Sequence, residues 1–152
     1  MDGTLLLISL GTNCGGPGKL AETIEALREA FGEVAATVPE ETAPLEGTGP
    51  SYFNCVVMTR TMLVPQEVKR CLREIEARLG RDRSTPAVVA IDLDLLLYGN
   101  LVDATLKLPS SDLVERPFCL QPAAELAPDF IHPILKISLT ALAQKGKQHE
   151  QH

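Results

Sequence analysis

The sequence predicts an α+β protein: a ferredoxin-like βαββαβ antiparallel sheet with its two helices on one face and a C-terminal extension. Two observations support this. Strand-like apolar runs and helical periodicities follow one another in the order β-α-β-β-α-β. The 152 residues, 45% hydrophobic and 22% charged, are also enough for one compact domain with a full-sized core. We therefore expect a single domain over 1–152 that ends in a short polar tail. The sheet face opposite the two helices is expected to be free for a ligand.

The first half of the chain supplies the first β-α-β unit. An apolar run over Thr4–Leu10 predicts the first strand. Lys19–Phe31 has apolar residues at helical spacing and is followed by a glycine, which predicts the first helix. A weaker strand is expected over Val34–Thr42, before a loop over Ala43–Pro50 that is rich in proline and glycine.

The second half repeats the pattern and then extends it. Tyr52–Met62 predicts a strong strand, and Pro65 suits the first turn of the second helix, which should stop at Gly80. A loop over Arg81–Ala87 leads into a strand over Val88–Tyr98. The extension is expected to contain a strand at Leu101–Leu108, a turn at Pro109–Asp112 and short helical segments near 123–127 and 135–143.

Asp92 and Asp94 lie two residues apart in this otherwise apolar strand. Residues i and i+2 of a strand share a face, so the two carboxylates should project together while Leu93 and Leu95 point into the opposite layer. Burying an ionised carboxylate costs several kcal/mol unless a cation or strong donors meet it. The pair therefore indicates either a metal or arginine partner, or a face that is simply wet.

Three arginines are candidate partners for an anionic ligand. Arg81 and Arg83 lie just before the aspartate strand, and Arg116 lies before Pro117. Arginines in such loops are usually solvated surface. Beside a carboxylate pair that binds metal, their guanidinium groups could instead bind phosphate oxygens bidentately and neutralise charge during transfer.

Composition and spacing disfavour several classes of function. The net charge of −6 and the pI near 5.0 argue against general nucleic-acid binding. The apolar runs are too short to span a bilayer and the N-terminus lacks a basic start, so we expect a cytoplasmic protein without a membrane partner. The four cysteines lack zinc-site spacing. The glycine-rich segment 11–19 has Asn13 where a P-loop needs glycine, and it is followed by Leu20 where a P-loop needs a hydroxyl residue.

Short motifs occur in a specific order between about Leu6 and Pro133. Together they resemble the hydroxymethyldihydropterin pyrophosphokinase family. The motifs are Leu10-Gly11-Thr12-Asn13, Glu41-Thr42-Ala43-Pro44-Leu45, Tyr52-Phe53-Asn54, Ile75-Glu76, Leu79-Gly80-Arg81-Asp82-Arg83, Ile91-Asp92-Leu93-Asp94-Leu95-Leu96-Leu97-Tyr98-Gly99, Leu108-Pro109 and Glu115-Arg116-Pro117-Phe118.

This resemblance implies a ferredoxin-like fold and an enzyme of folate biosynthesis. The implied reaction moves pyrophosphate from the co-substrate ATP to 6-hydroxymethyl-7,8-dihydropterin, giving AMP and the pterin diphosphate. Asp92 and Asp94 would bind two Mg²⁺ ions, for which hard oxygen ligands are suited. Arg81 and Arg83 would complete the catalytic set.

The resemblance also implies two sets of substrate-binding residues. A flat pterin would stack between aromatic rings and be read at its edge by hydrogen bonds. The pterin set is Thr42, Leu45, Tyr52, Asn54 and Phe118. The ATP set is Arg81, Leu95, Lys107, Ser110 and Arg116.

The sequence departs from the family pattern on the nucleotide side. Val89 replaces a usual arginine, Ser110 stands where a histidine usually follows the proline, and the loop before Asp92 is about two residues shorter. Lys107 and Arg83 could replace part of the lost charge. A pterin-binding protein with weak or no kinase activity is therefore the alternative, and an assembly or regulatory module is a third. We expect a monomer that binds small molecules.

Overall fold

The computed structural model describes residues 3–44, 49–80 and 90–150 and has the predicted α+β architecture. One five-stranded antiparallel sheet has the order β2-β4-β1-β5, and β3 also pairs with β4. Its strands are β1 (Thr4–Thr12), β2 (Ala35–Ala36), β3 (Glu40–Thr42), β4 (Tyr52–Thr61) and β5 (Asp92–Tyr98). The helices are α1 (Gly16–Phe31), α2 (Pro65–Arg78), α3 (Asp112–Glu115), α4 (Pro117–Leu126) and α5 (Leu139–Glu150).

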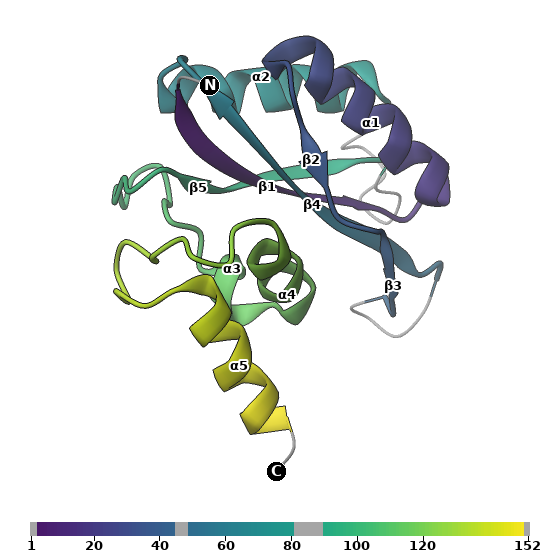
Figure 1. Cartoon of the computed structure of the whole chain (residues 1–152). Coiled ribbons are helices and arrows are strands. Elements are labelled where there is room, and N and C mark those ends of the chain that lie inside the picture. The colour runs from purple at the N-terminus through teal and green to yellow at the C-terminus, as the bar shows by residue number, and fades with distance from the viewer. Residues whose placement is uncertain (1–2, 45–48, 81–89, 151–152) are drawn as a thin grey trace.

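Both faces of the sheet carry helices. Helices α1 and α2 lie on one face, as predicted, whereas α3, α4 and α5 lie on the other (Figure 1). The expectation that this second face is free was therefore wrong for part of its area. The reason lies in the strands themselves, because Leu7, Val56, Leu96 and Leu97 project from this face and pack with Leu113 and Leu139 of the C-terminal segment.

Strand alternation separates the two cores. On β1, Leu6, Ile8 and Leu10 pack against α1 and α2, while Leu7 faces the C-terminal helices. Further along the Leu7 face, Ser9 and Gly11 replace large side chains. A hollow forms there, between this end of the sheet and helices α3 and α4.

A β-bulge in β5 explains why its apolar run does not alternate. Leu7 pairs with Leu97 but Ile8 pairs with Leu95, which leaves Leu96 as an extra residue. Leu96 and Leu97 consequently both pack on the C-terminal side, whereas Leu93 and Leu95 lie in the other core, as predicted. Asp92 and Asp94 share the face of Leu96 and therefore point toward the hollow.

Two strand predictions need correction. The strand expected over Val34–Thr42 is divided into β2 and β3, and Pro39, which has no backbone N–H, lies between them. The Thr37 hydroxyl accepts a hydrogen bond from the Val56 amide there, in place of a backbone carbonyl. The prediction of a strand over Leu101–Leu108 was wrong. Within this range, Asp103 and Leu108 form only an isolated bridge around a turn.

The helix boundaries also differ from the prediction. Helix α1 begins at Gly16 rather than Lys19, because Gly15 takes a positive φ of 112° before it and Pro17 fits the first turn. Helix α4 begins at Pro117, well before the expected segment near 123, and α5 begins at Leu139 rather than near 135. No helix in the described ranges is both long and apolar enough to cross a bilayer.

His132 stabilises the turn before α5. Its side chain is buried, and its Nδ1 accepts hydrogen bonds from the backbone N–H groups of Ile134 and Leu135 at 3.2 and 3.1 Å. Burial lowers the pKa of His132 below its ordinary value. A protonated Nδ1 could accept neither bond, so the neutral ring is the form that the fold requires.

The stability of this turn should depend on pH. The unfolded chain binds a proton to His132 near pH 6.5 and the folded chain only at lower pH, so the stabilisation is present above about pH 6.5 and is lost below it. Asn at position 132 keeps a δ acceptor that does not titrate. Between pH 6.5 and 5, the free energy of unfolding of the wild type should therefore fall relative to His132→Asn, by up to about 1.4 kcal/mol per pH unit. Parallel curves from denaturant titrations would contradict this assignment.

Candidate active site

A cavity of about 330 Å³ opens at the end of the sheet that contains Ser9 and Gly11. It lies between β1, β4 and β5 on one side and α3 and α4 on the other. Seven of the residues predicted for the site line it, although they come from four separate stretches of the chain. They are Thr42, Tyr52, Asn54, Asp92, Asp94, Arg116 and Phe118.

The carboxylate pair forms one wall of this cavity. Asp92 and Asp94 lie opposite Gly11, which has no side chain, and Ser9, which has a small one, so space remains in front of the carboxylates. The pKa of Asp94 is raised to about 7, first by burial and then by the charge of Asp92, a hydrogen bond with Asp92, and the charges of Asp112 and Glu76. The site therefore concentrates negative charge that a cation would relieve.

This donor set fits Mg²⁺ better than a metal held by protein ligands alone. Among the described residues, no group of three or more His, Cys, Asp or Glu side chains is arranged to hold a metal ion. Magnesium commonly uses one or two carboxylates and takes its other oxygens from water and phosphate. Two adjacent aspartates beside an open cavity match that requirement.

Asn54 and Thr42 form a second wall. Asn54 is buried, and its Nδ2 donates a hydrogen bond of 2.8 Å to Thr42 Oγ1 across the β3–β4 pair. Gly11 allows this arrangement, because a Cβ at position 11 would lie 3.0 Å from Asn54 Oδ1. The strands thus hold an amide and a hydroxyl side by side at the cavity wall, where they can recognise the polar edge of a ring.

Arg116 and Phe118 form the wall on the helical side. Arg116 Nε donates a hydrogen bond of 3.0 Å to Asp112 Oδ1, one helical turn earlier. The guanidinium carbon lies 5.7 Å from the centroid of the Phe118 ring. The hydrogen bond and the charge of Asp112 raise the pKa of Arg116, so this residue remains cationic.

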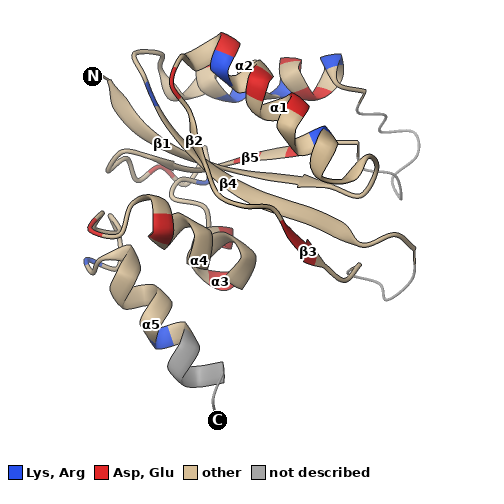
Figure 2. Ribbon diagram, turned by 45° about the vertical axis from the view of Figure 1, so that its right-hand side comes forward, with Lys and Arg blue, Asp and Glu red and all other residues tan. Residues whose placement is uncertain are grey.

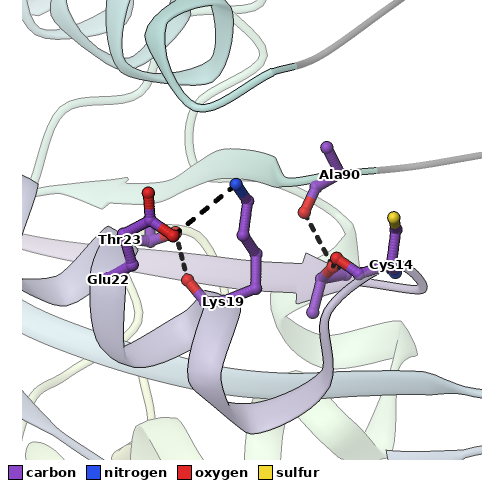
Figure 3. Close-up of polar contacts among 6 residues, drawn as sticks. Cys14, Lys19, Glu22, Thr23 and Ala90 are labelled. Carbon is purple, nitrogen blue, oxygen red and sulfur yellow. Dashed lines mark hydrogen bonds and ion pairs between the residues drawn. The ribbon is translucent and has the colours of Figure 1, made fainter.

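Thr12 connects the end of β1 with the chain that enters β5. Its buried hydroxyl donates to the Ala90 carbonyl at 2.7 Å and accepts a hydrogen bond from the Cys14 amide at 3.1 Å. Lys19, Glu22 and Thr23 make further polar contacts at the start of α1, including an ion pair of 3.7 Å between Lys19 and Glu22 (Figure 3). The Thr12 bond fixes the backbone two residues before Asp92.

A second hollow of about 250 Å³ lies at the outer edge of β5. It is lined by Asp92, Leu93, Asp94 and Leu95 of β5 and by Lys69, Leu72, Arg73 and Glu76 of α2. We call it the edge groove. The buried Glu76 accepts a hydrogen bond of 2.8 Å from the Leu93 amide. By the two-residue period of a strand, the N–H and C=O of Leu95 should also face this groove.

The remaining predicted residues are not gathered in the cavity. Leu95 lines the edge groove, while Lys107 lies in the turn before Pro109 with a positive φ of 57°. The Ser110 amide donates to the Leu96 carbonyl, and Ser110 lines neither hollow. Leu45, Arg81 and Arg83, like Val89, lie outside the described residues.

The sequence prediction missed several residues that line the two hollows. Ser9 and Cys119 line the cavity together with Asp112, and Lys69 and Arg73 line the edge groove. Asp112 could have been found from its spacing, since it lies four residues before Arg116. Lys69 and Arg73 gave no comparable signal, because a charge on a helix is usually only solvated, and nothing in the sequence singled out Ser9 or Cys119.

A larger groove elsewhere offers less chemistry. It has a volume of about 500 Å³ and runs along β2 and β4, with Arg28, Glu33 and Arg60 in its lining. Glu33 is the single carboxylate among its described lining residues, so it lacks the paired acids of the cavity beside β5.

Comparison with known proteins identifies relatives over most of the chain. The model of the family described as 7,8-dihydro-6-hydroxymethylpterin-pyrophosphokinase (HPPK) matches residues 7–128. The 2-amino-4-hydroxy-6-hydroxymethyldihydropteridine pyrophosphokinase of Aquifex aeolicus is 35% identical over 135 residues, which are 85% of this chain and 84% of that protein. The protein of the same name from Methylorubrum extorquens is 36% identical over 137 residues, which cover 84% and 85% of the two chains.

Longer proteins contain a similar segment. The folic acid synthesis protein FOL1 of Dictyostelium discoideum is 37% identical over 93 residues, which are 58% of this chain and 14% of that protein. This chain spans 21% of the fol1 protein of Pneumocystis carinii.

Among solved structures, wild-type Plasmodium falciparum HPPK-DHPS with pteroate matches this chain with a TM-score of 0.70 at 12% identity. The match covers 97% of this chain and 43% of that structure's chain. An HPPK-DHPS in complex with substrates has a TM-score of 0.75 at 11% identity, with 98% and 44% covered. Both structures share the fold described above.

Proposed function

Because this chain belongs to the 7,8-dihydro-6-hydroxymethylpterin-pyrophosphokinase family, we propose that it transfers pyrophosphate from ATP to 6-hydroxymethyl-7,8-dihydropterin, giving AMP and the pterin diphosphate. The observation that carries this proposal is the cavity beside β5, which joins an amide, two aromatic rings and a carboxylate pair. An acceptor ring and a metal-bound phosphate chain would therefore meet at Asp92 and Asp94.

The pterin would occupy the cavity between β4 and α4. Tyr52 and Phe118 offer aromatic faces for a flat bicyclic ring, and Asn54 with Thr42 offers a donor and acceptors to its edge. Arg116 is held beside Phe118 by Asp112 and so can meet an anionic group at the rim. We also assign Leu45 to this subsite on the family resemblance.

The nucleotide would enter from the edge groove. Leu95 lines the groove, and its backbone N–H and C=O would face it there, where groups of an edge strand can hydrogen-bond a heterocyclic base. The polyphosphate would then run toward Asp92 and Asp94, which line both the groove and the cavity. Lys107, Ser110, Arg81 and Arg83 complete the proposed nucleotide and catalytic set.

Asp92 and Asp94 would hold Mg²⁺, and we propose two ions. When bound, magnesium supplies charge screening and stabilisation of the attacking and leaving oxygens of an in-line displacement. The residues of the cavity orient the pterin so that its hydroxyl oxygen faces the β-phosphorus. A new bond forms from that oxygen to the β-phosphorus, the bond from the β-phosphorus to the bridging α-oxygen breaks, and AMP leaves. The proton of the pterin hydroxyl would pass to solvent water.

Chromatographic detection of AMP tests the proposal directly. Purified protein with ATP, Mg²⁺ and the pterin should release AMP and the pterin diphosphate in equal amounts. Omission of the pterin should stop AMP release, which distinguishes transfer from hydrolysis. Tight pterin binding with no AMP above background would instead support the alternative of a pterin-binding protein.

A further inference from the structure

Helix α2 turns one face toward the edge groove. Lys69, Leu72, Arg73 and Glu76 have the spacing i, i+3, i+4 and i+7, which places their side chains along a single stripe of the helix. Figure 2 shows basic and acidic residues on this helix. In this stripe of α2, Lys69 and Arg73 precede Glu76, and the stripe faces β5 across the edge groove.

Among the described residues, the cations of this stripe have no carboxylate as an ion-pair partner. Lys69 is half-buried, and its Nζ donates to the Leu106 carbonyl at 2.5 Å. In the described part of the chain, no acidic side chain forms an ion pair with Lys69 or Arg73. Arg70 and Arg78 of the same helix do form such pairs, with Glu67 and Glu29 respectively.

Like charges also gather around Lys69. Burial lowers the pKa of Lys69, and the positive charges of Arg73 and Lys107 lower it further, against the opposing effect of Asp94 and Asp103. Lys69 and Arg73 thus line the groove, Lys107 lies close enough to Lys69 to repel its charge, and none of the three forms an ion pair with a described acidic residue. Such a cluster is stabilised when an anion with several negative oxygens binds between its members.

We propose that Lys69 and Arg73 bind the polyphosphate chain of the nucleotide from the α2 side of the edge groove. This inference rests on the proposed function, because it assumes that a nucleotide lies there. A polyphosphate in the groove would face the carboxylates of Asp92 and Asp94 on β5, so cations on the α2 wall opposite them would offset the repulsion. They would also supply positive charge in a sequence that has Val89 in place of the arginine usual in the family.

Substitutions in the full-length protein test this role. Arg73→Gln and Lys69→Met keep much of the aliphatic side chain and remove the charge. Each should raise the KM for ATP about tenfold and leave the KM for the pterin within about twofold, since a charge-assisted bond to phosphate is lost. Arg70→Gln is the matched control, because Arg70 lies on the same helix but outside the groove and pairs with Glu67. Its KM for ATP should match that of the wild type.

Arg73→Gln carries the decisive result, because no hydrogen bond or ion pair to the rest of the described fold is lost with it. An unchanged KM for ATP in Arg73→Gln and Lys69→Met, with active wild type, would overturn the inference and leave the proposed function standing. If the wild type releases no AMP, the proposed function fails, and calorimetry with inorganic tripolyphosphate and Mg²⁺ decides the inference alone. Weaker tripolyphosphate binding in the two variants would support it, and no binding to the wild type or equal binding to all would overturn it.

Discussion

Asp94→Asn should reduce AMP formation by at least about 1,000-fold and remove Mg²⁺-dependent nucleotide binding. The substitution keeps the size of the side chain but removes a negative oxygen ligand from a site that has two adjacent carboxylates. Pterin affinity should change little, because Asn54, Thr42 and Phe118 lie on other walls of the cavity. Product assays and calorimetry with each substrate would separate the two effects.

The same variant should fold more stably without metal at pH 8. The pKa of Asp94 is raised to about 7 in the folded protein, so its charge opposes folding above pH 7, and this penalty disappears as pH falls toward the unfolded value near 4. Because Asp94 is still partly exposed, we expect a gain of only about 1 kcal/mol at pH 8. Asp129→Asn, at an exposed position outside both hollows, should alter neither activity nor stability. An active Asp94→Asn enzyme would contradict the assignment of Asp94 as a metal ligand.

The orientation of the carboxylates could be predicted because it follows from local geometry. The period of two along β5 placed Asp92 and Asp94 opposite Leu93 and Leu95, and the structure confirms this. The bulge at Leu96 could not be read from an uninterrupted leucine run. It depends on how β1 pairs with β5 and on what covers each face.

The rest of the site depends on contacts between distant segments. Asp112 and Glu76 raise the pKa of Asp94, yet they come from a short helix and from α2, and neither belongs to the aspartate motif. Lys69 and Arg73 look like ordinary solvated charges until α2 packs beside β5. The C-terminal helices were likewise underestimated, since the need to cover Leu7 and Val56 appears only when the sheet is assembled.

The cavity and the edge groove share Asp92 and Asp94, but the rest of their linings suits two different substrates. The cavity has the aromatic and amide groups that suit a neutral ring, whereas the edge groove has cations that suit a polyphosphate. Substitutions elsewhere in the cavity should therefore weaken the binding of the pterin, and substitutions elsewhere in the edge groove should weaken the binding of the nucleotide. Changes at Asp92 or Asp94 should instead affect the reaction between the two substrates. This separation makes the binding of each substrate testable on its own.

Asn54→Ala should weaken pterin binding roughly 100-fold. Without the Asn54 amide, a polar group on the edge of the buried ring loses its hydrogen-bond partner, and each such loss costs about 1–3 kcal/mol of binding free energy. Asn54 is buried at the cavity wall and its Nδ2 is already oriented by Thr42 Oγ1. Fluorescence titration with the pterin would measure the loss, and calorimetry should show unchanged binding of a nucleotide analogue with Mg²⁺.

Two further variants separate recognition from structural damage. Thr42→Val removes the orienting hydroxyl but keeps the amide, so its loss of pterin affinity should be smaller, about tenfold. Asn100→Ala, in the exposed turn after β5, is the matched control and should bind the pterin as the wild type does. If Asn54→Ala retained full pterin affinity, the ring would have to bind away from the β4 wall. The cavity would then no longer explain how the acceptor is positioned beside Asp92 and Asp94.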